Sequence, residues 1–368
     1  MSATRTSLPA TMRAIVLTGL GGPDKLESVV LPRPEPGPDE VLIEVRTVAT
    51  NRQDVYTMSG WANRRAPLPM PHVMGIDPAG VVAAVGADVA DLVPGDRVVV
   101  KPSISCGDCT FCRQGEDDAC ENLENVGVHR PGGMADYVPV PQRNVFRIPA
   151  NISYAEATAI SHSFPVALTM IRDRARVTAD DTVLVTSASG AVGSAAVQLA
   201  RIAGARVIAA AGGADRAAYA RAIGASAVIN YRANPAFGDE VLELAPDGVT
   251  VYVETAGNPV VWKEALRTLA RRGRIAVCGS HGGPIVELDL TWLFRTRATI
   301  VGSSGSSLAA YRQVLELAAD GRLQPNIHAV LPLDQVRDAF ATLLERGNRG
   351  KVILEVSTDR QRPGRPAP

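Results

Sequence analysis

The stretch DTVLVTSASGAVGSAAVQLARIAGARVIAAA, residues 181–211, has the pattern of a buried strand, a tight turn, a helix and a second buried strand. On the glycine fingerprint of dinucleotide-binding turns, Ala188, Gly190 and Gly193 occupy the three glycine positions. Gly190 would let the backbone approach a pyrophosphate, and Gly193 would let the helix pack close to the strand. The pattern therefore predicts a dinucleotide site, and its alternative is a strand–helix turn without a ligand. The predicted site residues are Ser189, Gly190, Ala191, Val192 and Gly193.

The chain on both sides of this stretch indicates the wider fold. Downstream, the runs SAVINY, VTVYVETAG, GRIAVCG and ATIVGSS are further buried-type strands, separated by helical patterns. This alternation predicts an α/β fold with a parallel sheet that has helices on both faces. Upstream, short strand-like runs such as EVLIEVRTVAT and GVVAAVG are broken by Gly and Pro and predict a mostly β region. Near the end, HAVLPL and GKVILEV are β-like again.

The end of the second strand indicates which dinucleotide is bound. NAD-preferring sites place Asp or Glu there to bind the ribose 2′-hydroxyl. This chain has Ala210 and Ala211 instead, so no carboxylate would repel a 2′-phosphate. Arg216 follows where a guanidinium could pair with that phosphate, and Gly212 and Gly213 let the backbone turn beneath it. We therefore expect NADP(H); the alternative for Arg216 is an exposed helix residue.

Composition and charge limit the other possibilities. The 368 residues carry 38 Lys+Arg and 38 Asp+Glu, and this balance suggests neither a nucleic-acid nor a membrane partner. The chain begins without an apolar run long enough for a signal peptide, so we expect a cytoplasmic protein.

Four of the five cysteines lie in CGDCTFCRQGEDDAC, residues 106–120. In a reducing compartment, such a cluster favours metal ligands over disulfides. The C-x2-C-x2-C-x7-C spacing predicts a closed tetrahedral zinc site without catalytic function, and the alternative is a loop of free thiols. The predicted ligands are Cys106, Cys109, Cys112 and Cys120.

This order of regions resembles the medium-chain dehydrogenase/reductase superfamily, zinc-type alcohol dehydrogenase-like. PGDRV (94–98), GGMADYV (132–138) and GKVIL (350–354) also match it, and ASGAVGSAAVQLA and AGGADR resemble its quinone oxidoreductase-like branch. The resemblance implies a Rossmann domain at 156–321 and a GroES-like catalytic domain at 1–155 and 322–368, with flexible tails at 1–11 and 358–368. It also implies a homodimer or higher homo-oligomer, for which RATIVGSS is a candidate edge strand.

The resemblance implies further cofactor contacts. Tyr231 and Lys351 would lie near the adenosine phosphate and the phosphates, respectively; the alternatives are a strand-end aromatic and a surface lysine. Residues after the last two predicted strands would meet the cofactor at the carboxyl edge of the sheet. These are Gly279, Ser280, Gly302 and Ser303.

The positions of a catalytic zinc give a different result. Alcohol dehydrogenases of this superfamily use Cys, a His–Glu pair and a later Cys or His. Here Asn51 stands in the first position, Ile76 and Asp77 replace the pair, and His162 aligns with the third. Isoleucine cannot bind zinc and a catalytic zinc needs about three protein ligands, so we expect no catalytic zinc. His162 is then a polar residue of the cleft or a hydrogen-bonded core histidine.

Without that metal, an activated acceptor is easier to reduce than a simple ketone. Hydride transfer to a quinone or an α,β-unsaturated carbonyl leaves charge on an oxygen that needs hydrogen-bond donors. NRQDVYTMSGW supplies candidates: Asn51 and Tyr56 for contact with substrate or cofactor, Asp54 as a structural residue and Trp61 as a pocket wall. With His162, Asn51 and Tyr56 are the predicted catalytic residues.

The sequence thus predicts an NADPH-dependent quinone or enone reductase acting on a small molecule. Two alternatives remain. One is an alcohol or aldehyde dehydrogenase with an atypical metal site, and the other is a non-catalytic NADPH-binding protein.

Overall fold

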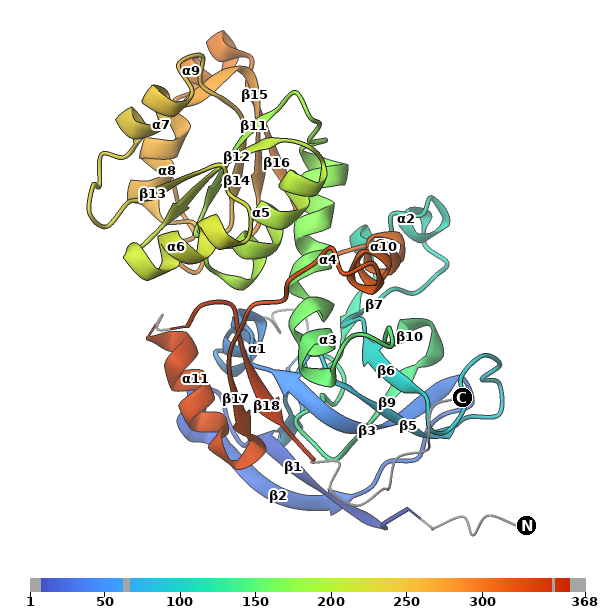
Figure 1. Ribbon diagram of the computed structural model, residues 1–368. Helices are drawn as coiled ribbons and strands as arrows, with labels where there is room; N and C mark the ends of the chain where they lie inside the picture. Colours follow the sequence, from blue (N-terminus) through green and yellow to red (C-terminus); the bar gives the residue numbers. More distant parts are fainter. Residues whose placement is uncertain (1–7, 62–66, 346–347, 358–368) are drawn as a thin grey trace.

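In the computed structural model, the described residues are 8–61, 67–345 and 348–357, and they form two sheet-based parts (Figure 1). Helices α3 (Tyr154–Ser161) and α4 (Ser163–Leu168) connect the two parts. A π-helical turn (Thr169–Arg174) follows α4 before the chain enters its parallel sheet.

The parallel sheet has six strands, all paired in parallel. The strand that precedes the glycine fingerprint is central, and the strand order reverses at its side, which is the place where doubly wound sheets bind ligands. In spatial order the strands are β13 (Ala227–Asn230), β12 (Arg206–Ala211), β11 (Thr182–Thr186), β14 (Val249–Glu254), β15 (Leu269–Val277) and β16 (Thr299–Gly302).

Helices cover both faces of this sheet because successive strand residues point to opposite sides. Val183 and Val185 pack in one cluster with α4, α5, α6 and α10, whereas Leu184 packs in another with α7, α8 and α9. The α/β class and the doubly wound parallel sheet predicted from the sequence are confirmed. The helices are α5 (Ala191–Ile202), α6 (Ala214–Ala222), α7 (Gly238–Leu244), α8 (Pro259–Leu266), α9 (Leu290–Thr296) and α10 (Leu308–Ala319).

The second part is mostly β, as the upstream runs predicted. Its main sheet is centred on β3 (Glu40–Ala49) and encloses a core of Val, Ile, Leu and Met. The other strands of this sheet are β5 (Ala79–Val85), β6 (Arg97–Val100), β9 (Tyr137–Pro141), β10 (Val145–Arg147), β17 (Ile327–Pro332) and β18 (Lys351–Glu355). A smaller three-stranded sheet contains β1 (Thr11–Leu17), β2 (Leu26–Pro32) and β4 (His72–Val73). A two-stranded sheet contains β7 (Ser103–Ile104) and β8 (Glu124–Asn125).

The last two strands return the chain to the first part. β18 pairs antiparallel with β3, placing Ile353 opposite Ala49, and α11 (Val336–Leu344) packs beside it. This membership supports the predicted division near residues 155 and 322, which stays a prediction. The remaining helices are α1 (Arg52–Met58) and α2 (Thr110–Arg113), with 3₁₀ turns at Pro23–Lys25, Asp117–Ala119, Gln142–Asn144 and Leu333–Gln335.

Two further predictions concern the ends and the edges. Residues 1–7 and 358–368 of the predicted flexible tails lie outside the described residues, and Thr11 already begins β1. In the described part of the chain, no helix is long and apolar enough to cross a membrane. β16 is an edge strand of the parallel sheet, as RATIVGSS predicted.

Candidate active site at the junction of the two parts

The glycine fingerprint forms the turn between β11 and α5. Gly190 is the N-cap of α5, so the first turn of this helix presents its N–H groups beside the turn. A Cβ at Gly193 would lie 2.3 Å from the Ser187 carbonyl oxygen, which no side chain could tolerate. Glycine at this position is therefore required for the close packing of helix on strand that the sequence predicted.

The carboxyl ends of the neighbouring strands are arranged at the same edge of the sheet. Glu254, at the end of β14, is 1% exposed, and its Oε1 accepts hydrogen bonds from the backbone N–H groups of Ala256 (2.5 Å) and Gly257 (2.7 Å). This buried carboxylate fixes the loop after β14. The loop after β15 packs closely against it, since a Cβ on Gly279 would lie 2.5 Å from the Thr255 carbonyl oxygen. Gly302 ends β16, and Ser303 follows with a buried hydroxyl that has no partner among the described residues.

Cys278 and His281 lie in the loop after β15, and Cys278 does not have the character of a nucleophile. Burial raises the pKa of the Cys278 thiol to about 11, so it stays protonated and unreactive at neutral pH. His281 is half-buried in the same loop.

An open pocket of about 450 Å³ lies at the end of β12. Gly212 passes so close to Tyr231 that a Cβ there would lie 2.9 Å from the Tyr231 hydroxyl, and the N–H of Gly213 donates to Asn230 Oδ1 at 2.9 Å. The sequence predicted Gly212, Gly213 and Arg216 for this place, and all three line the pocket. The full lining is Gly212, Gly213, Ala214, Asp215, Arg216, Arg232, His328 and Arg349.

The charge of this pocket is predominantly positive. Three arginines face one carboxylate, that of the exposed Asp215. Arg232 follows β13, whereas His328 and Arg349 come from the returning chain, so both parts of the molecule contribute to the pocket. The sequence reasoning missed Arg232, His328 and Arg349. The position of Arg232 directly after the predicted contact Tyr231 was a usable signal, but nothing local pointed to the other two.

The returning chain also contacts the fingerprint turn. The backbone N–H of Gly350 donates to the Ser189 carbonyl oxygen at 3.0 Å. Arg349, Gly350 and Lys351 therefore run from the arginine pocket, past the fingerprint turn, to the buried side chains of Asn51 and Asp77.

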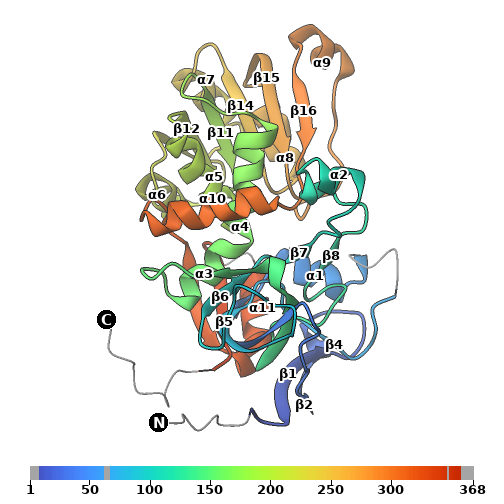
Figure 2. The ribbon, with the colours of Figure 1, turned by 90° about the vertical axis from the view of Figure 1, so that its right-hand side faces the viewer.

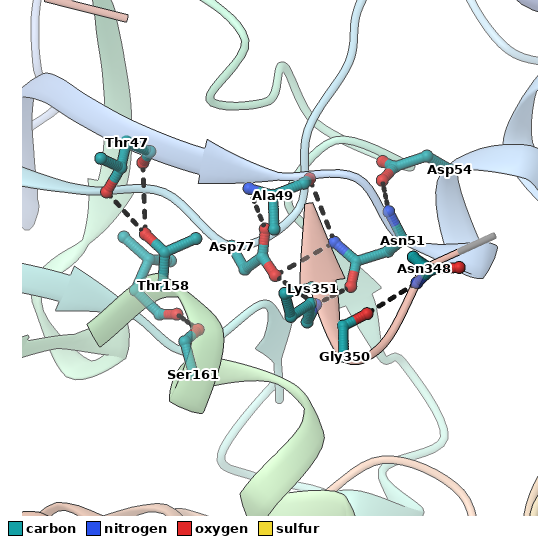
Figure 3. A network of polar contacts seen from close by, with 11 residues as sticks. Thr47, Ala49, Asn51, Asp54, Asp77, Thr158, Ser161, Asn348, Gly350 and Lys351 are labelled. Carbon is teal, nitrogen blue, oxygen red and sulfur yellow. Dashed lines mark hydrogen bonds and ion pairs between the residues drawn. The ribbon is translucent and has the colours of Figure 1, made fainter. Parts of the chain in front are cut away.

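At the end of this path, the Lys351 side chain is buried among polar groups (Figure 3). Its Nζ donates to Asn51 Oδ1 and, at 2.9 Å, to Asp77 Oδ2. Asn51 Nδ2 donates to the same Asp77 oxygen at 3.0 Å, and the Ala49 N–H donates to Asp77 Oδ1 at 3.0 Å. Asn51, Asp77 and Lys351 form a buried polar triad, and each of them is at most 5% exposed. The sequence analysis named all three residues, but it did not predict that Lys351 contacts Asn51 and Asp77.

Local structure holds the triad in place. Asn51 is the N-cap of α1, and its backbone N–H donates to Asp54 Oδ2 at 2.8 Å in a capping box. Asp54 is fully buried, and its other carboxylate oxygen has no partner among the described residues. Burial and the charge of Asp77 raise the pKa of Asp54 to about 7.

His162 lies at the junction of α3 and α4 and is half-buried. Burial lowers its pKa to about 4, helped by the charge of Lys351 and opposed by that of Asp77. The ring is therefore neutral at physiological pH, and in the described part of the chain its nitrogens have no hydrogen-bond partner. The predicted residues Asn51 and His162 thus belong to one electrostatic neighbourhood with Lys351.

Tyr56 does not join the triad. It lies on α1, half-buried, with its ring centroid 4.9 Å from that of Trp61, which is 51% exposed. The two rings lie on and just after α1, the helix that begins beside Asn51. Contact of either ring with a substrate stays a prediction. Arg52 turns elsewhere and donates to the Leu343 carbonyl oxygen at 2.7 Å.

The four cysteines converge as the spacing predicted. Their Sγ atoms all lie within 4.8 Å of one another, with Cys106 3.4 Å from Cys120 and 3.9 Å from Cys112. A tetrahedral zinc with ligands at about 2.3 Å spaces its sulfurs by about 3.8 Å, so the cluster fits this ion. Among the described residues, it is the one group of three or more His, Cys, Asp or Glu side chains that could hold a metal.

Beside this cysteine lobe, one ion pair and one hydrogen bond join the two parts of the molecule. Lys101 is fully buried and lies 3.5 Å from Asp117, whose carboxylate accepts from the N–H of Leu308 at the start of α10. Arg174 pairs with Asp118 at 3.1 Å. The lobe therefore lies near α10, which runs between the two parts (Figure 2). Within the described residues, none of the triad side chains hydrogen-bonds to the four cysteines.

Known proteins match nearly the whole chain. Residues 37–150 match the alcohol dehydrogenase GroES-like domain, and residues 191–320 match the zinc-binding dehydrogenase domain. The quinone oxidoreductase-like protein 2 of Rattus norvegicus is 31% identical and covers 94% of this chain and 92% of its own. The L-threonine 3-dehydrogenase of Coxiella burnetii is 33% identical, covering 88% and 94%. A solved NAD-dependent alcohol dehydrogenase is 38% identical, with a TM-score of 0.89, and covers 94% of this chain and all of its own.

The lobe predicts a defined metal content. Protein purified without chelator should contain about one zinc per chain by elemental analysis, and Cys112→Ser should remove most of it and lower the unfolding temperature, because three thiolates hold the ion less tightly. Cys278→Ser, outside the lobe, is the control and should keep the zinc. Four titratable thiols and no zinc would establish the free-thiol alternative, and two zinc ions per chain would indicate a second site.

The shifted groups of the cleft predict opposing effects of pH on stability. The native pKa of Asp54 lies above its unfolded value, so its contribution is present below about pH 4 and is lost as pH rises through 7. The native pKa of His162 lies below its unfolded value, so its contribution is present above about pH 6.5 and is lost as pH falls through 4. When the pH rises from 4.5 to 7, the unfolding free energy of Asp54→Asn should increase by on the order of 2 kcal/mol relative to that of the wild type. Over the same pH change, the unfolding free energy of His162→Gln should decrease relative to that of the wild type. Urea unfolding at both pH values measures this, and parallel changes in all three proteins would contradict the assignment.

Proposed function

The chain belongs to the medium-chain dehydrogenase/reductase superfamily, and from this premise we propose that it is an NADPH-dependent reductase of quinones or α,β-unsaturated carbonyls that uses no catalytic zinc. Oxidoreductase activity follows from the family. The acceptor, the cofactor and the metal independence are the proposal.

One observation carries the metal independence. The Lys351 ammonium lies between Asn51 and Asp77, at two of the places where related alcohol dehydrogenases have zinc ligands. A second cation beside this ammonium would be repelled, and Ile76 offers no ligand. The residues present therefore do not fit a catalytic zinc, whereas the four cysteines fit a structural one.

The pocket at the end of β12 supports NADP(H). Arg216, Arg232 and Arg349 supply guanidinium groups that match the geometry and charge of a 2′-phosphate. Ala210 and Ala211 leave the strand end without the carboxylate that would select a ribose hydroxyl. The solved alcohol dehydrogenase described as NAD-dependent differs in this respect from what we propose for this chain.

When bound, the cofactor supplies a hydride from its nicotinamide. The chain's own residues have three tasks. The Ser189–Gly193 turn and the N–H groups of α5 hold the pyrophosphate, the loops after β14, β15 and β16 position the nicotinamide, and the cleft between the two parts excludes water. Tyr231 and Ser303 are further proposed cofactor contacts, the latter because its buried hydroxyl has no partner among the described residues.

We include a homodimer in the proposal. β16 is an edge strand, and the segment before it exposes large apolar side chains on and near α9. Pairing of this edge with a second copy would cover the exposed Ile285, Leu290 and Phe294.

The activity test is NADPH oxidation with a panel of quinones, enones, aldehydes and alcohols, with and without a mild chelator. We expect turnover of quinones or enones that chelation leaves unchanged. Activity on alcohols alone, abolished by chelation, would establish the dehydrogenase alternative. Tight NADPH binding without turnover of any acceptor would establish the non-catalytic one.

The cofactor test uses Arg349→Gln. Loss of one charge-assisted contact to the 2′-phosphate should raise the Kd for NADPH about tenfold while the Kd for NADH stays the same. Arg295→Gln, on the exposed side of α9, is the matched control and should change neither. Isothermal titration measures both constants, and tighter binding of NADH than NADPH by the wild type would contradict the assignment.

A further inference from the structure

We propose that Lys351 is a catalytic residue whose ammonium group stabilises the negative charge that reduction places on the acceptor's oxygen. Lys351 would thus supply the positive charge that a metal supplies in related dehydrogenases. The inference rests on the proposed function, because it names the residue that makes a zinc-free reduction feasible.

The first observation is where the ammonium lies. Three segments distant in sequence meet at its Nζ: the N-cap of α1, the turn before β5 and the start of β18 (Figure 3). Asn51 and Asp77 come from the first two of these segments, and both stand at positions of the catalytic zinc site of related alcohol dehydrogenases. The positive charge therefore lies beside two of these positions.

The second observation is the donor count. A lysine ammonium has three N–H groups, and two of them are used by Asn51 Oδ1 and Asp77 Oδ2. Within residues 8–61, 67–345 and 348–357, no acceptor for the third is found. The neutral His162 ring also has no hydrogen-bond partner in that part of the chain, and the charge of Lys351 helps to lower its pKa. An acceptor oxygen bound at the third N–H would complete the hydrogen bonding of the ammonium.

The third observation is the distance along the chain to the cofactor site. Gly350 donates to the Ser189 carbonyl oxygen of the fingerprint turn at 3.0 Å, and Lys351 is the next residue. The ammonium therefore lies at the junction of the cofactor and substrate regions. Asp77 and Asn51 act through Lys351 as positioning residues, since Asp77 Oδ2 and Asn51 Oδ1 hold its Nζ.

The electrostatic effect is strong because the group is buried. Lys351 is 3% exposed, and a charge in such surroundings acts on a nearby oxyanion far more strongly than it would in water. In an enone, the β-carbon gains the hydride, the electron pair of its C=C bond shifts to form the enolate, and the charge on oxygen faces the ammonium. Water then protonates the α-carbon, so that the saturated carbonyl compound and the oxidised cofactor are the products.

The test is Lys351→Gln, which keeps an N–H donor for Asp77 and removes the charge. We expect kcat for the best acceptor to fall about 100-fold, while the Kd for NADPH stays close to that of the wild type. The unfolding temperature should fall, because Asp77 loses its buried counter-charge. Lys351→Arg restores the charge and should recover a large part of kcat. Lys263→Met, an exposed lysine on α8, is the control and should behave as the wild type.

Each other outcome would overturn the inference. An unchanged kcat in Lys351→Gln would show that the charge is not used in the reaction. A raised Kd for NADPH with an unchanged kcat at saturation would make Lys351 a phosphate ligand, as the resemblance implied. A loss of kcat that Lys351→Arg does not recover, although it restores the unfolding temperature, would make the ion pair purely structural. A wild type that turns over no acceptor would instead refute the proposed function itself.

Discussion

The ion pair between Lys351 and Asp77 is the interaction on which the cleft depends. Burying an isolated ammonium or carboxylate costs far more than a typical hydrogen bond contributes, so each is tolerated only because the other lies 2.9 Å away. Since Lys351 begins β18 and Asp77 precedes β5, the pair also ties the end of the chain to the first part of the molecule. Removing one partner would leave a buried charge unpaired and would disturb Asn51 and the start of α1 with it.

The two candidate centres of the molecule differ in physical character. The cysteine lobe offers four soft thiolates in a closed arrangement, which suits an ion that holds structure and leaves no position open for a substrate. The triad offers an ammonium with one N–H group left over, a neutral amide and a carboxylate. Under the proposed function, the cysteine lobe would hold a structural ion and the Lys351 ammonium would supply the positive charge at the reacting centre.

The three consecutive residues Arg349–Lys351 contact three different parts of the candidate site. Arg349 lines the pocket at the end of β12, Gly350 contacts the fingerprint turn, and Lys351 enters the triad. Because this segment belongs to the part of the chain that pairs with β3, cofactor binding would draw both parts of the molecule together. The cysteine lobe also connects the two parts, because the Asp117 carboxylate accepts from the Leu308 N–H at the start of α10.

The sequence by itself determined the parallel sheet, the glycine turn and the cysteine cluster. These are local features: strand hydrophobicity, the steric demand at Gly193 and the spacing of four cysteines are written in contiguous residues. Only the tertiary structure decided that Lys351 meets Asn51 and Asp77, and which arginines surround the pocket. Lys351 is separated from Asn51 by 300 residues and His328 and Arg349 from Arg216 by more than a hundred, so their meeting depends on the pairing of β18 with β3. A lysine before an apolar strand is ordinarily a solvated residue, and its role here follows from the buried carboxylate it meets.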